Sequence, residues 1–288
     1  MDETLRDQVQ IPEWQKYWNE TGPKLLTYLN GNSDPLMVTY LVNCIGFYSY
    51  LTENWEKKTT KNSELRGKLS IFLVETQDLM RGVLASYEHM TMAPIALLLR
   101  TAFEIHVIVK FIMRSDDPAK WADLFDRFQY IEQILGARAS IQLPDPTDED
   151  LKRVAEMCPE WFEPGTIKFR DRRPHWTASN TDLRKMAETA HVNLGDKYVD
   201  LYKINSKFTH ASPLIRNMYR KDNGLHSIPS REQCGILAMI AMGECIEVLK
   251  QSCDFFGVDF PGYDYAIICN DAIESISGKC LDPNDFPS

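Results

Sequence analysis

The sequence predicts an all-α protein, a multi-helix bundle around a central antiparallel helix hairpin at about residues 63–114. Two long segments, 63–89 and 92–113, repeat apolar residues every three or four positions, which is the period of a helix with a buried face. The link between them is so short that the second helix must fold back along the first. No segment shows the sustained alternation of apolar and polar residues that a half-buried strand requires.

The other elements follow from the same period and from the turn residues that separate them. Further helices are expected at about 12–30, 35–56, 118–139, 148–157, 180–191, 196–210, 229–256 and 264–276. Pro94 falls in a first helical turn, where the missing N–H of proline costs nothing. Thr147 or Asp148 can cap the helix at 148, and Ser179 or Asn180 can cap the helix that follows.

The distribution of proline and glycine sets the domain organisation. Residues 141–180 hold several prolines and turn residues, so we interpret them as an irregular insertion on the bundle. Residues 1–60 are then an N-terminal helical extension, and residues 221–288 are the C-terminal helices. With 44% hydrophobic residues, the chain 1–288 can bury its core as a single helical domain.

Composition excludes some functions and indicates a compartment. A net charge of −9 argues against a general affinity for nucleic acid, because that affinity depends on basic side chains that neutralise phosphates, although a local basic patch can override it. Seven scattered cysteines without a Cys-x-x-Cys motif are typical of reduced thiols that fill a core. The acidic N-terminus does not resemble a signal peptide. We therefore expect a cytoplasmic protein.

The most unusual feature is a charged pair inside the most apolar stretch of the chain. Arg100 and Glu104 lie one helical turn apart in the segment 92–113. That segment is long enough to span a bilayer, but four ionisable side chains make a membrane location too costly, so we expect a core helix and no membrane contact. An uncompensated buried charge costs about 3–5 kcal/mol, so the pair must be compensated or used.

A polar stripe is expected on the helix at 196–210. Tyr198, Tyr202, Ser206 and His210 are each four residues apart and therefore share one face. This stripe could supply polar neighbours to the charged pair, which would bring His210 within about 8 Å of Arg100. Alternatively, the tyrosines only pack and the histidine caps carbonyl groups at the helix end.

Three patterns together resemble a known microbial family. They are Leu-Leu-Arg100-Thr-Ala-Phe-Glu104, then His175-Trp176-Thr-Ala-Ser, then Tyr202-x-x-x-Ser206-x-x-x-His210-Ala-Ser-Pro. Their order and spacing over roughly residues 65–220 are similar to the family called domain of unknown function 5677, which has no settled activity. The resemblance implies that Arg100, Glu104 and His210 belong to one site.

The chain also resembles the HEPN superfamily of helical ribonucleases and nucleotide-binding proteins. Their signature places a histidine four to six residues after an arginine on one helix, and Arg100 and His106 satisfy this spacing. On an undistorted helix, however, the two lie roughly 240° apart, and Thr101 stands where HEPN proteins favour asparagine or aspartate. We therefore expect His106 to be a core histidine with a hydrogen-bond partner, and His210 to be the functional partner of Arg100.

The function we expect is a HEPN-like, metal-independent ribonuclease or phosphate-handling enzyme of a microbial defence or toxin system. Arg100, Glu104 and His210 are its predicted catalytic residues: a cation for phosphate, an orienting carboxylate and a general acid or base. The predicted substrate-binding residues are Tyr202, Ser206, Lys207, Arg173, His175 and Trp176. The last three belong to a basic segment beside an aromatic ring, which is either a phosphate or base contact or an ordinary solvated loop.

The expected partners follow from the same hypothesis. They are an RNA or nucleotide substrate, a protein partner and a second copy of the chain, since a homodimer would bring two single-histidine sites together. Glu88 and His89 could join Glu104 in a carboxylate metal site, but these residues lack the Glu-x-x-His spacing of di-iron bundles, and we expect neither a metal ion nor another cofactor. The alternative is a non-catalytic helical module that binds a protein or ligand, in which the same residues form a buried polar latch.

Overall fold

The protein is described here from a computed structural model. The residues that the structure describes are 35–59, 62–89, 91–139, 144–172, 174–179, 181–203, 205–209, 220–221, 224–225, 231–262, 265–266 and 268–269. The expected helix at 12–30 and most of the one at 264–276 lie outside these ranges.

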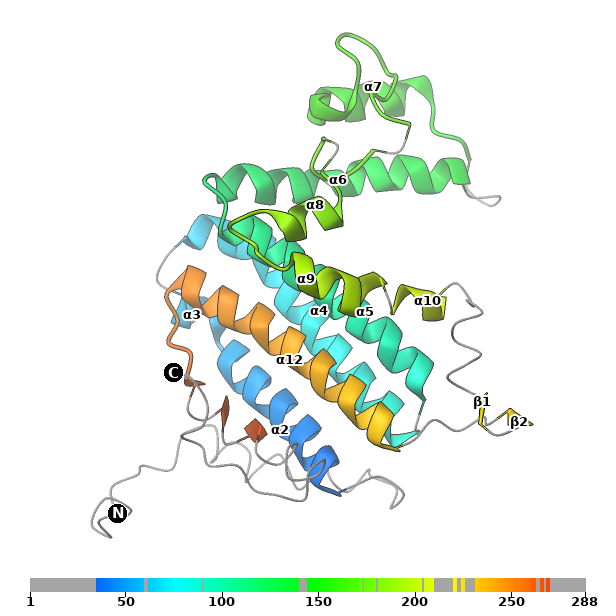
Figure 1. The fold of residues 1–288 in the computed structure, drawn as a ribbon. Coiled ribbons are helices and arrows are strands. Elements are labelled where there is room, and N and C mark those ends of the chain that lie inside the picture. The colour runs from blue at the N-terminus through cyan, green and yellow to red at the C-terminus, as the bar shows by residue number, and fades with distance from the viewer. Residues whose placement is uncertain are drawn as a thin grey trace.

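The described residues form a helical bundle, and the all-α prediction is confirmed (Figure 1). The strands among them are two short ones, β1 (Arg220–Lys221) and β2 (Gly224–Leu225), which pair antiparallel. Within the same part of the chain, no helix has both the length and the apolar character needed to cross a membrane.

The predicted central hairpin is also confirmed. It consists of α4 (Ser63–Glu88) and α5 (Met92–Met113), which pack against each other. Their close approach uses Gly82, where an added Cβ would lie 3.2 Å from a methyl carbon of Leu98. The glycine thus lets the two helices lie close to each other along the hairpin.

Two further helices complete the main layer. The long helix α12 (Arg231–Phe256) packs along both α5 and α4, and α2 (Pro35–Thr52) packs against α4 and α12 (Figure 1). Side chains from all four helices form one large apolar core. Among the six cysteines of the described residues five are buried, four of them in this core and Cys158 in the lobe, and burial raises the pKa of Cys253 to about 12.

Two expected helices are broken in the structure. The one expected at 35–56 ends at Thr52, and a short helix α3 (Trp55–Lys58) follows Asn54, whose φ of 54° is left-handed. Asparagine tolerates this conformation better than most residues, which allows the chain to turn there. The helix expected at 196–210 was also wrong as a single element, since three short helices replace it over its described part.

Those three helices are α9 (Gly195–Lys197), the π-helix η3 (Tyr198–Lys203) and α10 (Ser206–Thr209). They follow α8 (Leu183–Glu188), which is shorter than the helix expected at 180–191. The carboxylate of Asp182 caps α8 by accepting a hydrogen bond from the Lys185 N–H at 2.9 Å, so the cap predicted at Ser179 or Asn180 was wrong.

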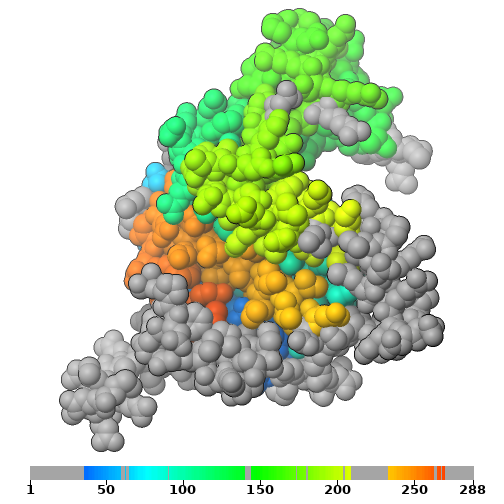
Figure 2. All heavy atoms as spheres, in the orientation of Figure 1, coloured from blue at the N-terminus to red at the C-terminus, as the bar shows by residue number. Residues whose placement is uncertain are grey.

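The insertion predicted at 141–180 packs on α6 (Pro118–Ala139) and forms a lobe at one end of the bundle (Figures 1 and 2). It contains α7 (Asp148–Met157) and the 3-10 helix η2 (Pro159–Trp161). Thr147 caps α7 as expected, in a capping box with Asp150. Eight buried side chains form a second apolar core between these elements: Leu124, Ile131, Ile134, Leu151, Val154, Cys158, Trp161 and Phe162.

A chain of ion pairs fastens this lobe to the hairpin. The Asp123 carboxylate on α6 accepts a hydrogen bond of 2.6 Å from Lys68 Nζ on α4 and another of 2.7 Å from Arg127 Nε. Arg127 also holds Glu160 of η2 with two hydrogen bonds of 2.8 Å each. Hydrogen bonds from Lys68 and Arg127 lower the pKa of the Asp123 carboxyl, and those from Arg127 lower that of Glu160. Both carboxylates therefore stabilise the fold above their ordinary titration range.

Polar side chains also join α5 to α12. His106 Nδ1 lies 2.6 Å from Glu244 Oε2, and both side chains are buried. Arg114, which follows the last residue of α5, donates to Gln251 at 3.0 Å and to Asp254 at 3.1 Å. Because higher numbers on and just after α5 pair with higher numbers on α12, the two helices run parallel.

The buried carboxylate of Glu244 depends on its contacts with His106 and Lys197. Burial raises its pKa, but hydrogen bonds and charge from His106 and Lys197 outweigh burial and hold the pKa below 4.5. Its negative charge therefore persists inside the protein and depends on these two partners. Lys197 lies 3.1 Å from Glu244 Oε1, with its own side chain 52% exposed.

Replacing His106 with leucine should lower the free energy of unfolding by about 3–5 kcal/mol, because Glu244 would lose its buried partner. Replacing Lys197 with alanine, the control, should cost no more than about 1 kcal/mol, since that side chain is half exposed to water. Urea denaturation at pH 7 measures both. Equal losses for the two variants would show that the buried pair is not the dominant contact of Glu244.

Candidate functional site

Arg100 lies on the side of α5 that η3 covers. Its Nη2 donates a hydrogen bond of 2.9 Å to the hydroxyl of Tyr202. Its guanidinium carbon also lies 4.7 Å from the centroid of the same ring, a cation–π contact. Tyr202 therefore orients the cation in two ways. Arg100 and Tyr202 are both half-buried, so the cation sits at the margin of the core and not in its centre.

Glu104 lies one turn along α5 and is half-buried as well. Burial raises the pKa of its carboxyl, and the positive charge of Arg100 offsets part of that effect. The pair predicted from the sequence thus interacts through charge, while the described hydrogen bond of Arg100 goes to Tyr202. A carboxyl with a raised pKa beside a fixed cation is an arrangement typical of acid–base sites.

The polar stripe is present as far as the structure describes it. Tyr198 and Tyr202 stack with their centroids 5.1 Å apart and their planes at 23°. Ser206 donates its hydroxyl to the Tyr202 carbonyl at 2.6 Å, which favours a hydrogen-bonding role over a nucleophilic one. Both tyrosines lie in the π-helix η3, a wider turn that is frequent at functional sites. Lys207 is exposed on α10.

His210 lies outside the described residues, and so does Arg173. Their predicted roles, including the approach of His210 to within about 8 Å of Arg100, stay predictions. The described part of the site is therefore Arg100, Glu104 and Tyr202, with Ser206 behind them.

His175 and Trp176, predicted to bind substrate, lie where the lobe meets the bundle, and Trp176 belongs to the large apolar core. Trp176 is 5% exposed, and its ring packs edge-on against Phe111, Trp121 and Phe125. That burial leaves the ring unsuited to stacking on a nucleic acid base.

His175 has its own local partners. Its Nδ1 lies 3.0 Å from the Thr177 hydroxyl, its carbonyl accepts from Trp161 at 2.7 Å, and burial lowers its pKa. Phe111, the α5 residue whose ring contacts Trp176, is eleven residues from Arg100, roughly 16 Å along the helix. The predicted substrate-binding residues thus fall into two separate groups.

The prediction for His106 is confirmed, because its Nδ1 is engaged with Glu244 inside the core. Arg100 and His106 have different partners on different sides of α5, so they do not share a site in the HEPN manner. Glu244 was recognisable as a charge on the apolar face of α12. Its pairing with His106, 138 residues away, had no local signal.

The family of the chain follows from comparison with known proteins. A search of curated proteins and a search of solved structures give no match. Among the described residues, no group of three or more His, Cys, Asp or Glu side chains is placed to hold a metal ion. A family model described as a family of unknown function, domain of unknown function 5677, matches residues 69–225, which include all of α5 and reach past α10. Because that match covers more than half of the 288 residues and spans the candidate site, the chain belongs to this family.

Proposed function

We propose that Arg100, Glu104 and Tyr202 form the phosphate-handling site of an enzyme, and that this enzyme is a HEPN-like, metal-independent ribonuclease. The observation that carries the proposal is the fixed position of Arg100 against Tyr202, next to a carboxyl whose pKa is raised. Its assignment to RNA, to a microbial defence or toxin system and to a homodimer rests on the resemblance to HEPN proteins, but not on the spacing of Arg100 and His106, which have different partners. Its assignment to the cytoplasm rests on the scattered cysteines.

The chemistry uses each group for one task. In metal-independent cleavage, the ribose 2′-oxygen attacks phosphorus as a base takes its proton, and the 5′-oxygen leaves as an acid protonates it. The Arg100 guanidinium would bind two phosphate oxygens and stabilise the charge that develops on them. Glu104, with its pKa moved towards neutrality, would serve in one proton transfer, and His210 in the other.

The first test is RNA cleavage by the full chain and by matched variants. Arg100→Gln, Glu104→Gln and His210→Ala should each lower the rate by about 100-fold or more, because each removes a transition-state contact or a proton transfer. Glu75→Gln is the matched control, since Glu75 is another carboxyl whose pKa burial raises, on the exposed face of α4. Folded Arg100→Gln and Glu104→Gln proteins that cut RNA at the original rate would contradict the proposal.

The pH dependence of the rate gives a second test. If Glu104 is the base, it works only when ionised, so the rate should rise with pH through a pKa above 4.5. The Glu104→Gln variant should lose this acidic limb, whereas Glu75→Gln should keep it. Single-turnover rates measured between pH 4 and pH 8, at intervals of about one pH unit, suffice to locate the pKa of this acidic limb. An acidic limb retained in Glu104→Gln would assign the titration to another group.

The alternative function, a binding module with a polar latch, is favoured by a specific contact. The Arg100–Tyr202 contact joins α5 to η3, 102 residues away in the sequence, and would fix the position of the π-helix whether or not chemistry occurs. In that case the loss of the Arg100–Tyr202 contact should lower the free energy of unfolding, and neither the original chain nor the variant should cleave RNA.

Tyr202→Phe should lower the free energy of unfolding by about 0.5–1.5 kcal/mol, because it removes a hydrogen bond but keeps the ring. Tyr198→Phe is the matched control: its ring stacks on Tyr202, and its hydroxyl has no hydrogen bond among the described residues. Urea denaturation of both variants measures the difference. Equal stability of the two would mean that the hydrogen bond of Arg100 contributes nothing to the latch.

A further inference from the structure

We infer that a hollow between α6, η2 and the turn at residues 177–179 binds a small phosphorylated molecule. Its volume is about 440 Å³, within the range of ligand pockets. The lining includes the cations Lys120 and Arg170 and the hydroxyl residues Thr177 and Ser179. The hollow belongs to the lobe and not to the surroundings of Arg100, so this inference does not depend on the proposed function.

The cations are available to a ligand. Arg170 is exposed, and its Nε donates to the carbonyl of Phe162 at 2.6 Å. Among the described residues this is the one hydrogen bond of its side chain, so the two terminal nitrogens can form the forked contact that phosphate oxygens accept. Lys120 is exposed too, and its ammonium lies 5.3 Å from the centroid of the Trp121 ring, which orients it.

The carboxylate in the lining does not cancel these charges. Glu160 is held by Arg127 in two hydrogen bonds of 2.8 Å, and its pKa is lowered, so its charge is already paired. The hollow therefore keeps an excess of positive charge in a chain whose net charge is −9. Such a local excess favours an anionic ligand over a neutral one.

The turn beside the cations contains one strained residue and is held by hydrogen bonds of its own hydroxyl groups. Ala178 has a φ of 50°, a left-handed conformation that is unfavourable for alanine. Around it, Ser179 donates to Thr177 at 3.1 Å and accepts from the Thr181 N–H at 3.3 Å. Thr177 is buried, and Ser179 is exposed at the rim of the hollow, with its single hydroxyl proton engaged inside the turn by Thr177 or by Thr181. The donors that a ligand can meet in the hollow are therefore the terminal nitrogens of Arg170 and the ammonium of Lys120, which suit the charged oxygens of a phosphate monoester.

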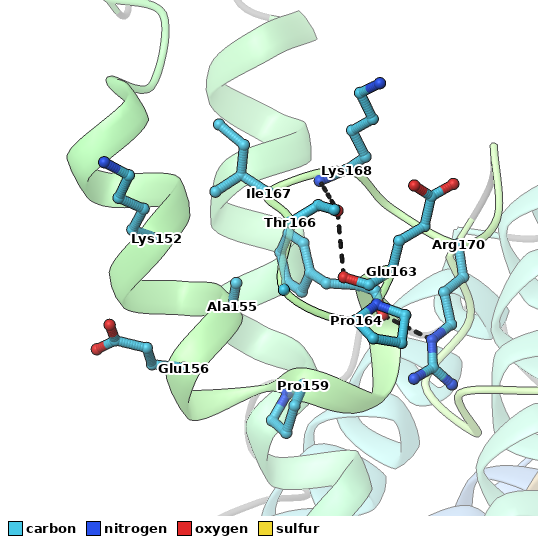
Figure 3. A pocket seen from close by; sticks show the side chains of 12 residues that line it. Lys152, Ala155, Glu156, Pro159, Glu163, Pro164, Thr166, Ile167, Lys168 and Arg170 are labelled. Atoms are coloured by element: carbon cyan, nitrogen blue, oxygen red, sulfur yellow. Dashed lines mark hydrogen bonds between the residues drawn. The ribbon is translucent and has the colours of Figure 1, made fainter.

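The neighbouring pocket does not share this character. It has a volume of about 700 Å³ and lies between α7, η2 and the chain that follows. Its charged rim is mixed, with Lys152 and Lys168 opposed by Glu156 and Glu163. Arg170 lines both pockets, and Figure 3 shows its guanidinium turned away from Lys168. The two pockets differ in their carboxylates: Glu160 of the smaller hollow is paired with Arg127, whereas Glu156 and Glu163 of the larger pocket have no ion pair among the described residues.

The test is calorimetric titration of the full chain with inorganic phosphate, against a chloride titration at equal ionic strength. Lys120→Gln and Arg170→Gln should each weaken phosphate binding by about tenfold or more, as expected for the loss of a charged hydrogen-bond donor. Arg172→Gln is the matched control, because Arg172 is exposed two residues further on and does not line the hollow. It should bind phosphate as the original chain does.

The outcomes that would overturn the inference are equally specific. One is a phosphate titration that does not differ from chloride. Another is an equal loss in Arg172→Gln, which would mean diffuse surface charge. A third outcome concerns a short RNA oligonucleotide. If the original chain binds this RNA but not phosphate, and if Lys120→Gln and Arg170→Gln bind the RNA with unchanged affinity, the hollow is not a phosphate site. Arg170→Gln also loses a contact to Phe162, so Lys120→Gln, whose side chain is exposed, decides the question if the other variant unfolds.

Discussion

The burial of α5 is the constraint on which the rest of the structure depends. The helix is apolar on nearly every face, and other helices pack around it, so each polar side chain on it needs a partner from a particular neighbour. His106 pairs with Glu244 on α12, and Arg100 donates to Tyr202 on η3. Arg114, just after the end of α5, donates to Gln251 and Asp254 on α12. These contacts fix which segments cover α5 and in which direction they run.

The two sides of α5 differ in what their polar groups can do. On the α12 side, His106 and Glu244 are closed off from water, and the charge of Glu244 is held by its partners, so this contact serves stability and register. On the η3 side, Arg100, Glu104 and Tyr202 are half-buried and can meet a ligand. Access, and not the mere presence of charge, separates the candidate site from the structural pair.

Ion pairs and aromatic packing join the lobe to the central hairpin. The Lys68–Asp123–Arg127–Glu160 chain of ion pairs fastens α6 and η2 to the hairpin, and the aromatic packing of Trp176 closes the junction. By engaging Glu160, Arg127 also leaves the excess positive charge of the adjacent hollow with Arg170 and Lys120. A contact that stabilises the lobe thereby shapes the electrostatics of the surface beside it.

The sequence by itself determined the helical class, the central hairpin and the unusual nature of Arg100, Glu104 and His106. These properties are local: apolar spacing sets which face is buried, prolines set where helices stop, and a charge in an apolar run signals a need for compensation. The positive φ at Asn54 and the π-helical turn at 198–203 left no trace in the apolar period, because hydrophobic spacing does not record a break of one residue.

Only the tertiary structure decided which partners those residues have. Glu244 is 138 residues from His106 and Tyr202 is 102 from Arg100, distances over which no periodic pattern carries information. Trp176 could be taken for an exposed aromatic beside arginines until its packing against Phe111 and Phe125 placed it in the core. A helix pattern specifies that a face must be covered, whereas the packing of the whole chain specifies what covers it.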